Sequence, residues 1–353
     1  LPLVYMESER DAPIYRIPTA AGAAGNVKSS VDQYVKFHNE KETEGGSRTE
    51  GYAEMINQYY DLVTDFYEWG WGQSFHFANR YKGENFYSSI ARSEHWLALQ
   101  MGLKPGMKVL DVGCGIGGPA REIARFSGCN VTGINNNEYQ ITRANKHTKS
   151  SMLEEQVDFV KGNFMELPFP DNHFDAIYQI EATAHAPDKV ACYSEIFRVL
   201  KPGGVFGSYE WCLTKNYDPE NEEHRNIKRG IEEGDGLPDI ATTEQVVEAM
   251  IAAGFNVTAQ EDRCMKLSPC DIPWYEPIES RYSIKNIHHT AVGHKFVTTF
   301  LRTLERVKLL NDGTAGVQEF LHTAAVNLTL GGQKEIFTPA FFTLAVKEDK
   351  SSE

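Results

Sequence analysis

The feature that most constrains the fold is a short apolar run that changes abruptly into a cluster of glycines. Residues 109–112 are aliphatic around a single aspartate, Asp111, and four of the next six residues are glycine. A pattern typical of a helix begins at Ala120. A strand, a glycine turn and a helix in succession are typical of parallel sheets, where the glycines let a ligand approach the backbone next to a helix N-terminus. The pattern therefore predicts an α/β fold that binds a nucleotide-like ligand.

Asp111 helps to distinguish between two such ligands. Gly113, Gly115 and Gly118 also satisfy the G-x-G-x-x-G spacing of dinucleotide-binding proteins, so a dehydrogenase that uses NAD is one alternative. A carboxylate two residues before the first glycine would repel a pyrophosphate but attract a sulfonium. The run around Asp111 resembles the first motif of class I methyltransferases that use S-adenosylmethionine (SAM). We therefore expect SAM as the cofactor, with contacts from Asp111, Gly113, Gly115 and Gly117; a tight turn without a ligand is the remaining interpretation.

The rest of the chain alternates between strand and helix patterns. This alternation predicts a doubly wound, mostly parallel, Rossmann-like sheet of seven strands. After the glycine turn we expect strands at 129–134, 157–160, 174–180, 205–211, 255–260 and 336–346, and helices at 118–126, 139–149, 188–200 and 244–253. Further helices at 296–307 and 317–330 would form a cap over the carboxyl edge of the sheet. We expect a flexible leader at 1–50, a methyltransferase domain at 51–267, and a C-terminal region at 268–353 that holds the cap and the last strand.

Polar residues follow the second and third strands of this pattern. Asn135 and Asn136 lie where nucleoside-binding sheets usually hold the ribose hydroxyls, and their carbonyl oxygens can accept a hydrogen bond. Asn163 and Phe164 follow the third strand, at the tip that lies beside adenine in this fold class. We therefore expect all four residues to contact the cofactor.

The segment 67–77 contains five aromatic residues, one acid and one histidine, interrupted by two glycines. Because the glycines follow tryptophans, we expect a shaped loop and not a continued helix. One interpretation is a small aromatic core beneath a loop. The other is a pocket wall that holds a large apolar ligand and turns ring faces toward a cation. The residues of this wall would be Tyr67, Trp69, Trp71, Phe75, His76 and Phe77, and Glu68 could stabilise the same cation.

The candidates for proton transfer follow the fourth strand. Glu181 and His185 are four residues apart and would share a face if this segment begins a helix. A carboxylate and an imidazole beside an apolar pocket can act as a general-base pair. Alternatively, His185 caps the next helix and Glu181 braces the loop. We expect no metal here, because no third ligand lies nearby. Residues 232–236 are expected to form an acidic loop, either a solvated turn or part of the pocket mouth.

Composition narrows the class of partner. The formal net charge of −14 over 353 residues argues against binding to nucleic acid. No run of eighteen apolar residues is present, so we expect no transmembrane span. The six cysteines lack C-x-x-C spacing, which favours reduced thiols over a zinc site.

Together these segments resemble the sterol 24-C-methyltransferases, a family within the class I SAM-dependent methyltransferases. The resemblance extends over residues 51–348, and the aromatic segment and 180–187 are its most discriminating parts. The matching segments are 67–77, 110–121, 135–137, 180–187, 209–211 and 331–339. Asn163 departs from the pattern, because we expect the family to carry Asp at this position.

The resemblance implies transfer of the SAM methyl group to C24 of a sterol side-chain double bond. Aromatic rings would hold the resulting cation, and a base would then remove a proton. Glu181 is the expected base with His185 in support, and Glu68 and Tyr67 are further catalytic candidates. The resemblance also implies a peripheral protein on the cytosolic face of the endoplasmic reticulum or on lipid droplets. Homo-oligomerisation, the preferred sterol and the number of methyl transfers stay open.

Two other functions remain compatible with the residues. A cyclopropane-fatty-acid-synthase-like enzyme also methylates an alkene through a cation, and bicarbonate dependence would favour it. A non-catalytic lipid-binding protein on the same fold would bind sterol without transferring a methyl group.

Overall fold

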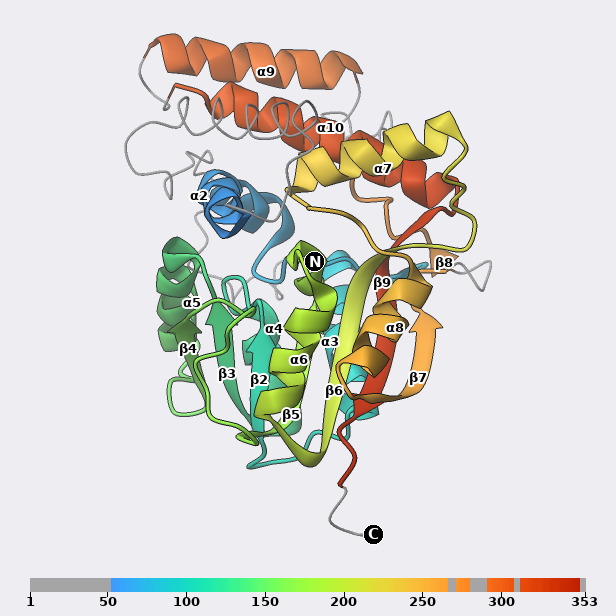
Figure 1. Cartoon of the computed structure of the whole chain (residues 1–353). Coiled ribbons are helices and arrows are strands. Elements are labelled where there is room, and N and C mark those ends of the chain that lie inside the picture. The colour runs from blue at the N-terminus through green and yellow to red at the C-terminus, as the bar shows by residue number, and fades with distance from the viewer. Residues whose placement is uncertain (1–51, 266–270, 280–290, 308–311, 350–353) are drawn as a thin grey trace.

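The computed structural model describes residues 52–265, 271–279, 291–307 and 312–349. Its centre is a seven-stranded sheet with the order β4-β3-β2-β5-β6-β9-β7 (Figure 1). The first five of these strands are parallel, and β9 runs antiparallel to both of its neighbours. The predicted mostly parallel, doubly wound sheet is therefore confirmed. The strands are β2 (Lys108–Val112), β3 (Asn130–Asn135), β4 (Val157–Lys161), β5 (Phe174–Ile180), β6 (Leu200–Leu213), β7 (Asn256–Asp262) and β9 (Phe337–Val346).

Helices cover both faces of the sheet. Helices α3 (Phe86–Gln100) and α4 (Gly118–Ser127) bury Leu97 and Ile123 in one core cluster. Helices α6 (Lys189–Val199) and α8 (Thr243–Ala252) bury Ile196 and Val246 in a second cluster. Helix α5 (Glu138–Ser150) packs beside β3 and β4. Because both faces are covered, the central strands are buried on both sides, as their mostly apolar sequences predict.

A further layer of helices lies over the carboxyl ends of the parallel strands (Figure 1). It consists of α2 (Tyr52–Trp71), α7 (Glu222–Asp235), α9 (Ala291–Arg306) and α10 (Thr314–Gln333). Helices α9 and α10 occur where the sequence predicts the cap. Helix α7 packs closely on α10, because a Cβ on Gly234 would lie only 2.5 Å from that of Ala324. A small sheet joins β1 (Arg80–Tyr81) to β8 (Asp271–Ile272).

Two elements differ from the sequence-based expectation. Helix α2 continues through Gly70 to Trp71, so the loop expected to begin at residue 67 begins at Gly72. A glycine inside a helix costs only about 1 kcal/mol, and the packing of buried residues such as Val63 offsets it. Residues 232–235, expected in an acidic loop, form the last turn of α7. That helix was missed because its apolar stripe is narrow, with Ile227 and Ile231 among many charged residues.

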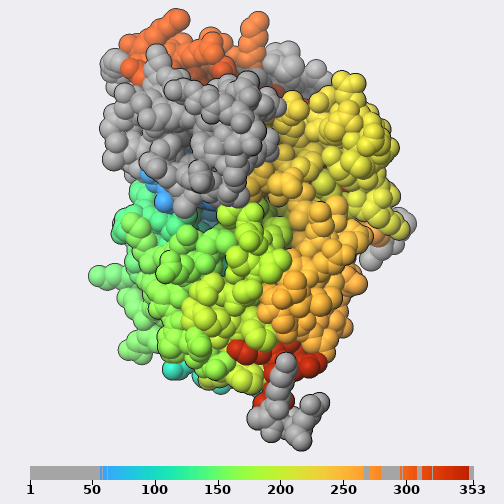
Figure 2. Space-filling view, viewed as in Figure 1, coloured from blue at the N-terminus to red at the C-terminus, as the bar shows by residue number. Residues whose placement is uncertain are grey.

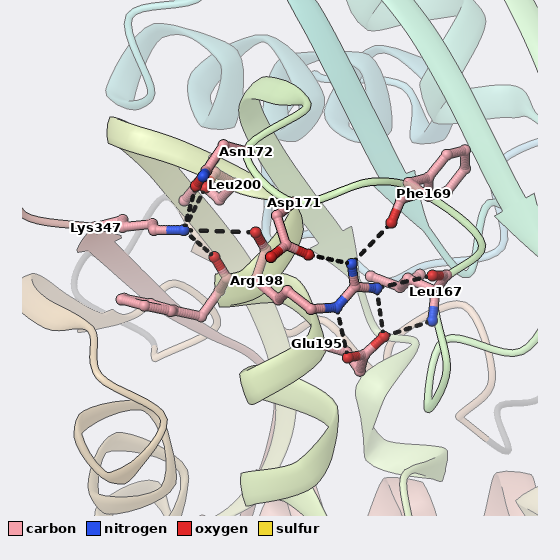
Figure 3. A network of polar contacts seen from close by, with 9 residues as sticks. Leu167, Phe169, Asp171, Asn172, Glu195, Arg198, Leu200 and Lys347 are labelled. Atoms are coloured by element: carbon pink, nitrogen blue, oxygen red, sulfur yellow. Dashed lines mark hydrogen bonds and ion pairs between the residues drawn. The ribbon is translucent and has the colours of Figure 1, made fainter.

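Polar contacts hold the C-terminal end of β9, which lies at the end of the sheet opposite the helical layer. The Lys347 Nζ donates to the carbonyl oxygens of Phe197 (2.8 Å), in the last turn of α6, and of Leu200 (2.7 Å), directly after that helix (Figure 3). Arg198 pairs with Glu195 in the same network. In the space-filling view the end of β9 (red) emerges far from α7 (yellow) and α9 (orange) (Figure 2). These contacts connect the end of β9 to α6, and the helical layer lies over the other end of the sheet.

No helix in the described ranges is long and apolar enough to cross a bilayer.

Candidate active site

The glycine turn after β2 combines positions required for packing with one that borders open space. Gly113, Gly115 and Gly117 all have positive φ, at 79°, 54° and 77°, a region that favours glycine. A Cβ on Gly113 would lie 2.3 Å from the Cβ of Ala182, and one on Gly117 would lie 2.4 Å from an aromatic carbon. A Cβ on Gly115 would meet only Phe75, at 3.7 Å. Gly115 is thus the position of this turn where a ligand can approach the backbone.

Asp111 is the penultimate residue of β2, two residues before Gly113, and it is 2% exposed. Burial raises the pKa of its carboxyl group to about 7. The Oδ2 atom is buried and makes no hydrogen bond of ordinary geometry in the part of the chain that the structure describes, and the nearby Tyr178 hydroxyl lowers the pKa of the carboxyl group only in part. A buried acceptor that lacks a donor is costly, and a ligand with a positive charge or N–H groups would compensate for it. This environment suits a sulfonium amino acid better than a pyrophosphate.

The candidate contacts on the next two strands differ in their environment. Asn135 is buried, and its amide donates to Gln140 Oε1 at 2.6 Å and to the Gly115 carbonyl at 3.4 Å. Asn135 therefore holds the glycine turn against α5. Asn136 is half-buried at the same strand end. Asn163 is exposed, and its Oδ1 accepts from the backbone N–H of Met165 at 3.0 Å, while the neighbouring Phe164 is half-buried.

Glu181 is the point where three parts of the chain meet. It directly follows β5, has a φ of 56° that is unusual for a residue other than glycine, and is half-buried. Its Oε1 accepts from the backbone N–H of Phe77 at 2.7 Å, and its Oε2 accepts from Trp211 Nε1 at 2.7 Å. Burial raises the pKa of Glu181 to about 8, although both donors and the nearby His76 oppose this shift. A single carboxyl group thus connects β5 with the aromatic segment and β6.

Trp211 was not among the residues predicted for the site. The sequence signal for it is the polar–aromatic run 209–211 at the carboxyl end of β6, next to the strand that carries Glu181.

His185 is placed differently from the expected partner of Glu181. It ends a short 3-10 turn, Thr183–His185, and is buried. Its Nε2 lies 2.8 Å from the Tyr60 hydroxyl of α2, and its Nδ1 lies 3.1 Å from the carbonyl oxygen of Gly236. The carbonyl can only accept, so Nδ1 carries the proton and Nε2 accepts from Tyr60. Burial lowers the pKa of His185 to about 4. The imidazole is thus neutral and positions Tyr60, a residue that sequence reasoning missed.

The aromatic segment beyond α2 forms a packed cluster. Trp71 donates from Nε1 to the His76 carbonyl at 2.8 Å, and its ring lies edge-on to that of Phe77 at 4.9 Å. The Phe77 ring is also edge-on to Trp274 at 4.9 Å. These contacts fix the backbone of Phe77, whose N–H is donated to Glu181. Trp71 and Phe77 therefore support the site through packing and positioning.

His76 lies behind this cluster, where it is buried. Its Nε2 is 3.1 Å from Glu94 Oε1, and its Nδ1 is 2.9 Å from the Phe77 carbonyl oxygen. Although burial lowers the pKa of His76, the hydrogen bond and charge of Glu94 raise it overall. Since both neighbours are acceptors, His76 acts as a double donor that fixes the loop.

Two residues expected near the cation lie elsewhere. Trp69 is 62% exposed, so its ring does not line an enclosed pocket. Glu68 bonds Arg143 Nε at 2.9 Å and His147 Nε2 at 2.8 Å, both on α5. Burial raises the pKa of Glu68, but His147 and Arg143 lower it overall. Because α2 stays helical here, Glu68 faces α5 while the ring of Trp69 is largely exposed to solvent.

Tyr67 and Phe75 remain on the side of the glycine turn. The Tyr67 hydroxyl lies 2.6 Å from that of Tyr59, and its ring is edge-on to Phe75 at 5.6 Å. Phe75 in turn is the neighbour of Gly115. Among the described residues, no group of three or more His, Cys, Asp or Glu side chains is arranged to hold a metal ion.

Comparisons with known proteins show the family to which the chain belongs. A methyltransferase-domain family matches residues 110–207, and a sterol methyltransferase C-terminal family matches residues 284–347. The cycloartenol-C-24-methyltransferase 1 of Oryza sativa subsp. japonica is 53% identical over 91% of this chain and 93% of its own length. The sterol 24-C-methyltransferase of Saccharomyces cerevisiae is 45% identical, with 92% and 87% covered.

Solved structures show the same fold. The [4+2]-cyclase SpnF is 24% identical, with a TM-score of 0.60 over 84% of this chain and 96% of its own. A geranyl diphosphate C-methyltransferase from Streptomyces coelicolor A3(2), solved with S-adenosyl-L-homocysteine, is 17% identical, with a TM-score of 0.59 over 84% and 98%.

Proposed function

The chain belongs to the sterol 24-C-methyltransferase family, and from that premise we propose that it methylates C24 of a sterol side-chain double bond, with Glu181 as proton acceptor. S-adenosylmethionine is the methyl donor. The assignment of Glu181 rests on one observation. Its half-buried carboxyl group accepts hydrogen bonds from the backbone N–H of Phe77 and from Trp211 Nε1. The next residue in the chain, Ala182, packs against Gly113, so Glu181 directly precedes a residue that contacts the glycine turn.

The residues around the glycine turn fit SAM. The open side of Gly115 would receive the cofactor against the backbone, and the orphaned Asp111 oxygen would be compensated by its positive charge. Asn136 would accept a hydrogen bond from a ribose hydroxyl, while Asn163 and Phe164 would flank the adenine. Gly113, Gly117 and Asn135 would act by shaping the turn. When bound, SAM supplies an electrophilic methyl group.

The protein must align an alkene, which is a poor nucleophile, and exclude water from the cation that forms. Phe75 lies next to Gly115 and packs edge-on against Tyr67, so these two rings are the candidates to attract the cation, because aromatic faces attract cations. A C–H bond beside the cation then breaks, its electron pair forms the new double bond, and the proton passes to a Glu181 oxygen. His185 keeps Tyr60 in place during this step through its neutral ring and takes no part in the proton transfer.

Isotopically labelled SAM tests this function. We expect a sterol with a C24 double bond to acquire the label, and the same sterol with a saturated side chain to remain unlabelled. A monounsaturated phospholipid, assayed with and without bicarbonate, serves as the competing substrate. Label in the phospholipid and none in the sterol would contradict the proposal, as would sterol binding without any transfer.

We also propose that the protein works as a peripheral protein at a sterol-containing membrane, on the endoplasmic reticulum or lipid droplets. The support is chemical, because a sterol partitions into lipid and must be taken up from it. Co-sedimentation with sterol-loaded vesicles tests this, and a protein that stays in the supernatant while still methylating dispersed sterol would contradict it. We further propose that the chain divides into a methyltransferase domain at 51–267 and a C-terminal region at 268–353.

A further inference from the structure

A second buried carboxyl group lies near the proposed site and has no assigned role. Asp235 is the last residue of α7, is 7% exposed, and its Oδ2 atom is buried without a hydrogen-bond partner among the described residues. The residues on either side of it contact the site. The Gly234 carbonyl accepts from the Tyr59 hydroxyl at 3.3 Å, and the Gly236 carbonyl accepts from His185 Nδ1 at 3.1 Å. Asp235 is therefore held between α2 and the turn that follows Glu181.

This position is unfavourable for an acid that has no partner. Burial raises the pKa of Asp235 to about 8. The C-terminal end of a helix carries a partial negative charge, which disfavours an ionised acid further. Buried polar groups are nearly always satisfied, so an unsatisfied one requires an explanation. A cationic ligand would provide one.

Tyr60 connects this acid to the proposed chemistry. Its hydroxyl donates to His185 Nε2 at 2.8 Å. After burial, the charges of Asp235 and Glu181 are the largest causes that raise the pKa of this hydroxyl. The charges of two carboxyl groups thus raise the pKa of the Tyr60 hydroxyl, and the hydrogen bond to His185 holds that hydroxyl in place. Asp235 belongs to the surroundings of the proposed reacting centre.

We propose that Asp235 is a second carboxylate of the site, which contacts and stabilises the cation formed on the sterol side chain. This inference rests on the proposed function. Glu181 already accepts from two N–H donors, whereas Asp235 Oδ2 has none, and a cation beside it would favour the ionised form of its carboxyl group. A neutral sterol side chain offers this carboxylate nothing, so the contact strengthens only as positive charge develops, which is the condition for lowering the barrier.

A pair of sterol ligands isolates this contact. One carries an ammonium nitrogen in the side chain where the cation would form, and the other is neutral and of the same shape. Calorimetry on the full chain should show that Asp235→Asn weakens binding of the ammonium sterol by about tenfold or more, as for loss of a hydrogen bond to a charged group. Binding of the neutral sterol should change less than about twofold.

The matched control is Asp239→Asn, which removes the same charge four residues later. The Asp239 side chain is 77% exposed and pairs with Lys228, so this variant should bind both ligands normally. SAM affinity and melting temperature show whether Asp235→Asn is folded, and Asp235→Ala takes its place in the same comparison if it is not.

An equal loss for both ligands, or no loss for either, would overturn the assignment of Asp235. These outcomes differ from failure of the proposed function, which is judged by methyl transfer to sterol in the unchanged protein. Normal transfer together with unaltered ammonium binding in Asp235→Asn would remove only this inference.

Discussion

At the scale of single residues, the decisive contrast is between Glu181 and His185. Both were expected to share the removal of a proton. The structure gives His185 a neutral ring with both nitrogens engaged, and burial lowers its pKa to about 4. Glu181 has a raised pKa of about 8 and directly precedes Ala182, which packs against Gly113 of the glycine turn. A carboxyl group whose pKa lies near the working pH can both accept and release a proton.

Replacing Glu181 by Gln keeps its size and removes the proton acceptor. We expect the yield of methylated alkene to fall on the order of a hundredfold or more, the range of general-base contributions. The cation would instead be captured by water, so an alcohol should appear among the products. Chromatography with mass spectrometry measures both, and calorimetry checks that SAM affinity is intact. Normal alkene yield in this variant would exclude Glu181 as the acceptor.

Replacing Gly115 by Val tests the cofactor site. The side chain would occupy the space open to a ligand, and a φ of 54° adds strain, so we expect loss of measurable SAM binding in calorimetry. Gly102→Val is the matched control, because Gly102 has a similar φ of 62°, with nothing within 4 Å of its Cβ position. If both variants bind SAM equally well, the glycine turn is not the cofactor site.

At the scale of elements, the sequence specified the sheet better than the layer above it. Strands such as β5 (Phe174–Ile180) are buried along nearly their whole length and are mostly apolar, so their limits can be predicted. The continuation of α2 through Gly70 depends on tertiary packing, which a local rule for glycine ignores. The Trp211–Glu181 and Tyr60–His185 contacts join residues 30 and 125 positions apart, and no local pattern reports such pairs.

Because α2 extends to Trp71, we expect Trp69 and Trp71 to contribute differently to stability. Trp71 packs edge-on against Phe77 and Phe86, at 4.9 and 5.0 Å, whereas Trp69 is 62% exposed. We expect Trp71→Ala to lower the free energy of unfolding by about 2 to 3 kcal/mol, somewhat less than for a fully buried tryptophan. Trp69→Ala should change it by less than about 0.5 kcal/mol. Urea unfolding measures both, and equal effects would contradict this description of the segment.

At the scale of the whole molecule, the proposed site and its surroundings contain three carboxyl groups that are costly to ionise. Burial raises the pKa of Asp111 to about 7, and those of Glu181 and Asp235 to about 8. Their ordinary values are 3.8 for Asp and 4.5 for Glu. The folded protein therefore binds protons more tightly than the unfolded chain at these positions. Their contribution to stability is complete below pH 4 and is lost as the pH rises through 7 to 8.

We accordingly expect the ligand-free protein to become less stable toward urea as the pH rises from about 5.5 to 8.5. Asp235→Asn removes one of the three acids, so its stability should fall less over the same range. Asp239→Asn, at an exposed position, should follow the unchanged protein. A slope that is the same in all three proteins would show that Asp235 ionises without cost.

The most direct test of the central claim is to locate the transferred carbon. The protein is incubated with SAM that carries a ¹³C-labelled methyl group and with a sterol that has a C24 double bond, and the product is examined by NMR. We predict that the labelled carbon is bonded to C24 and that a double bond is retained in the side chain. A label on any other sterol atom, or a protein that binds SAM and sterol but leaves the sterol unlabelled, would contradict the account.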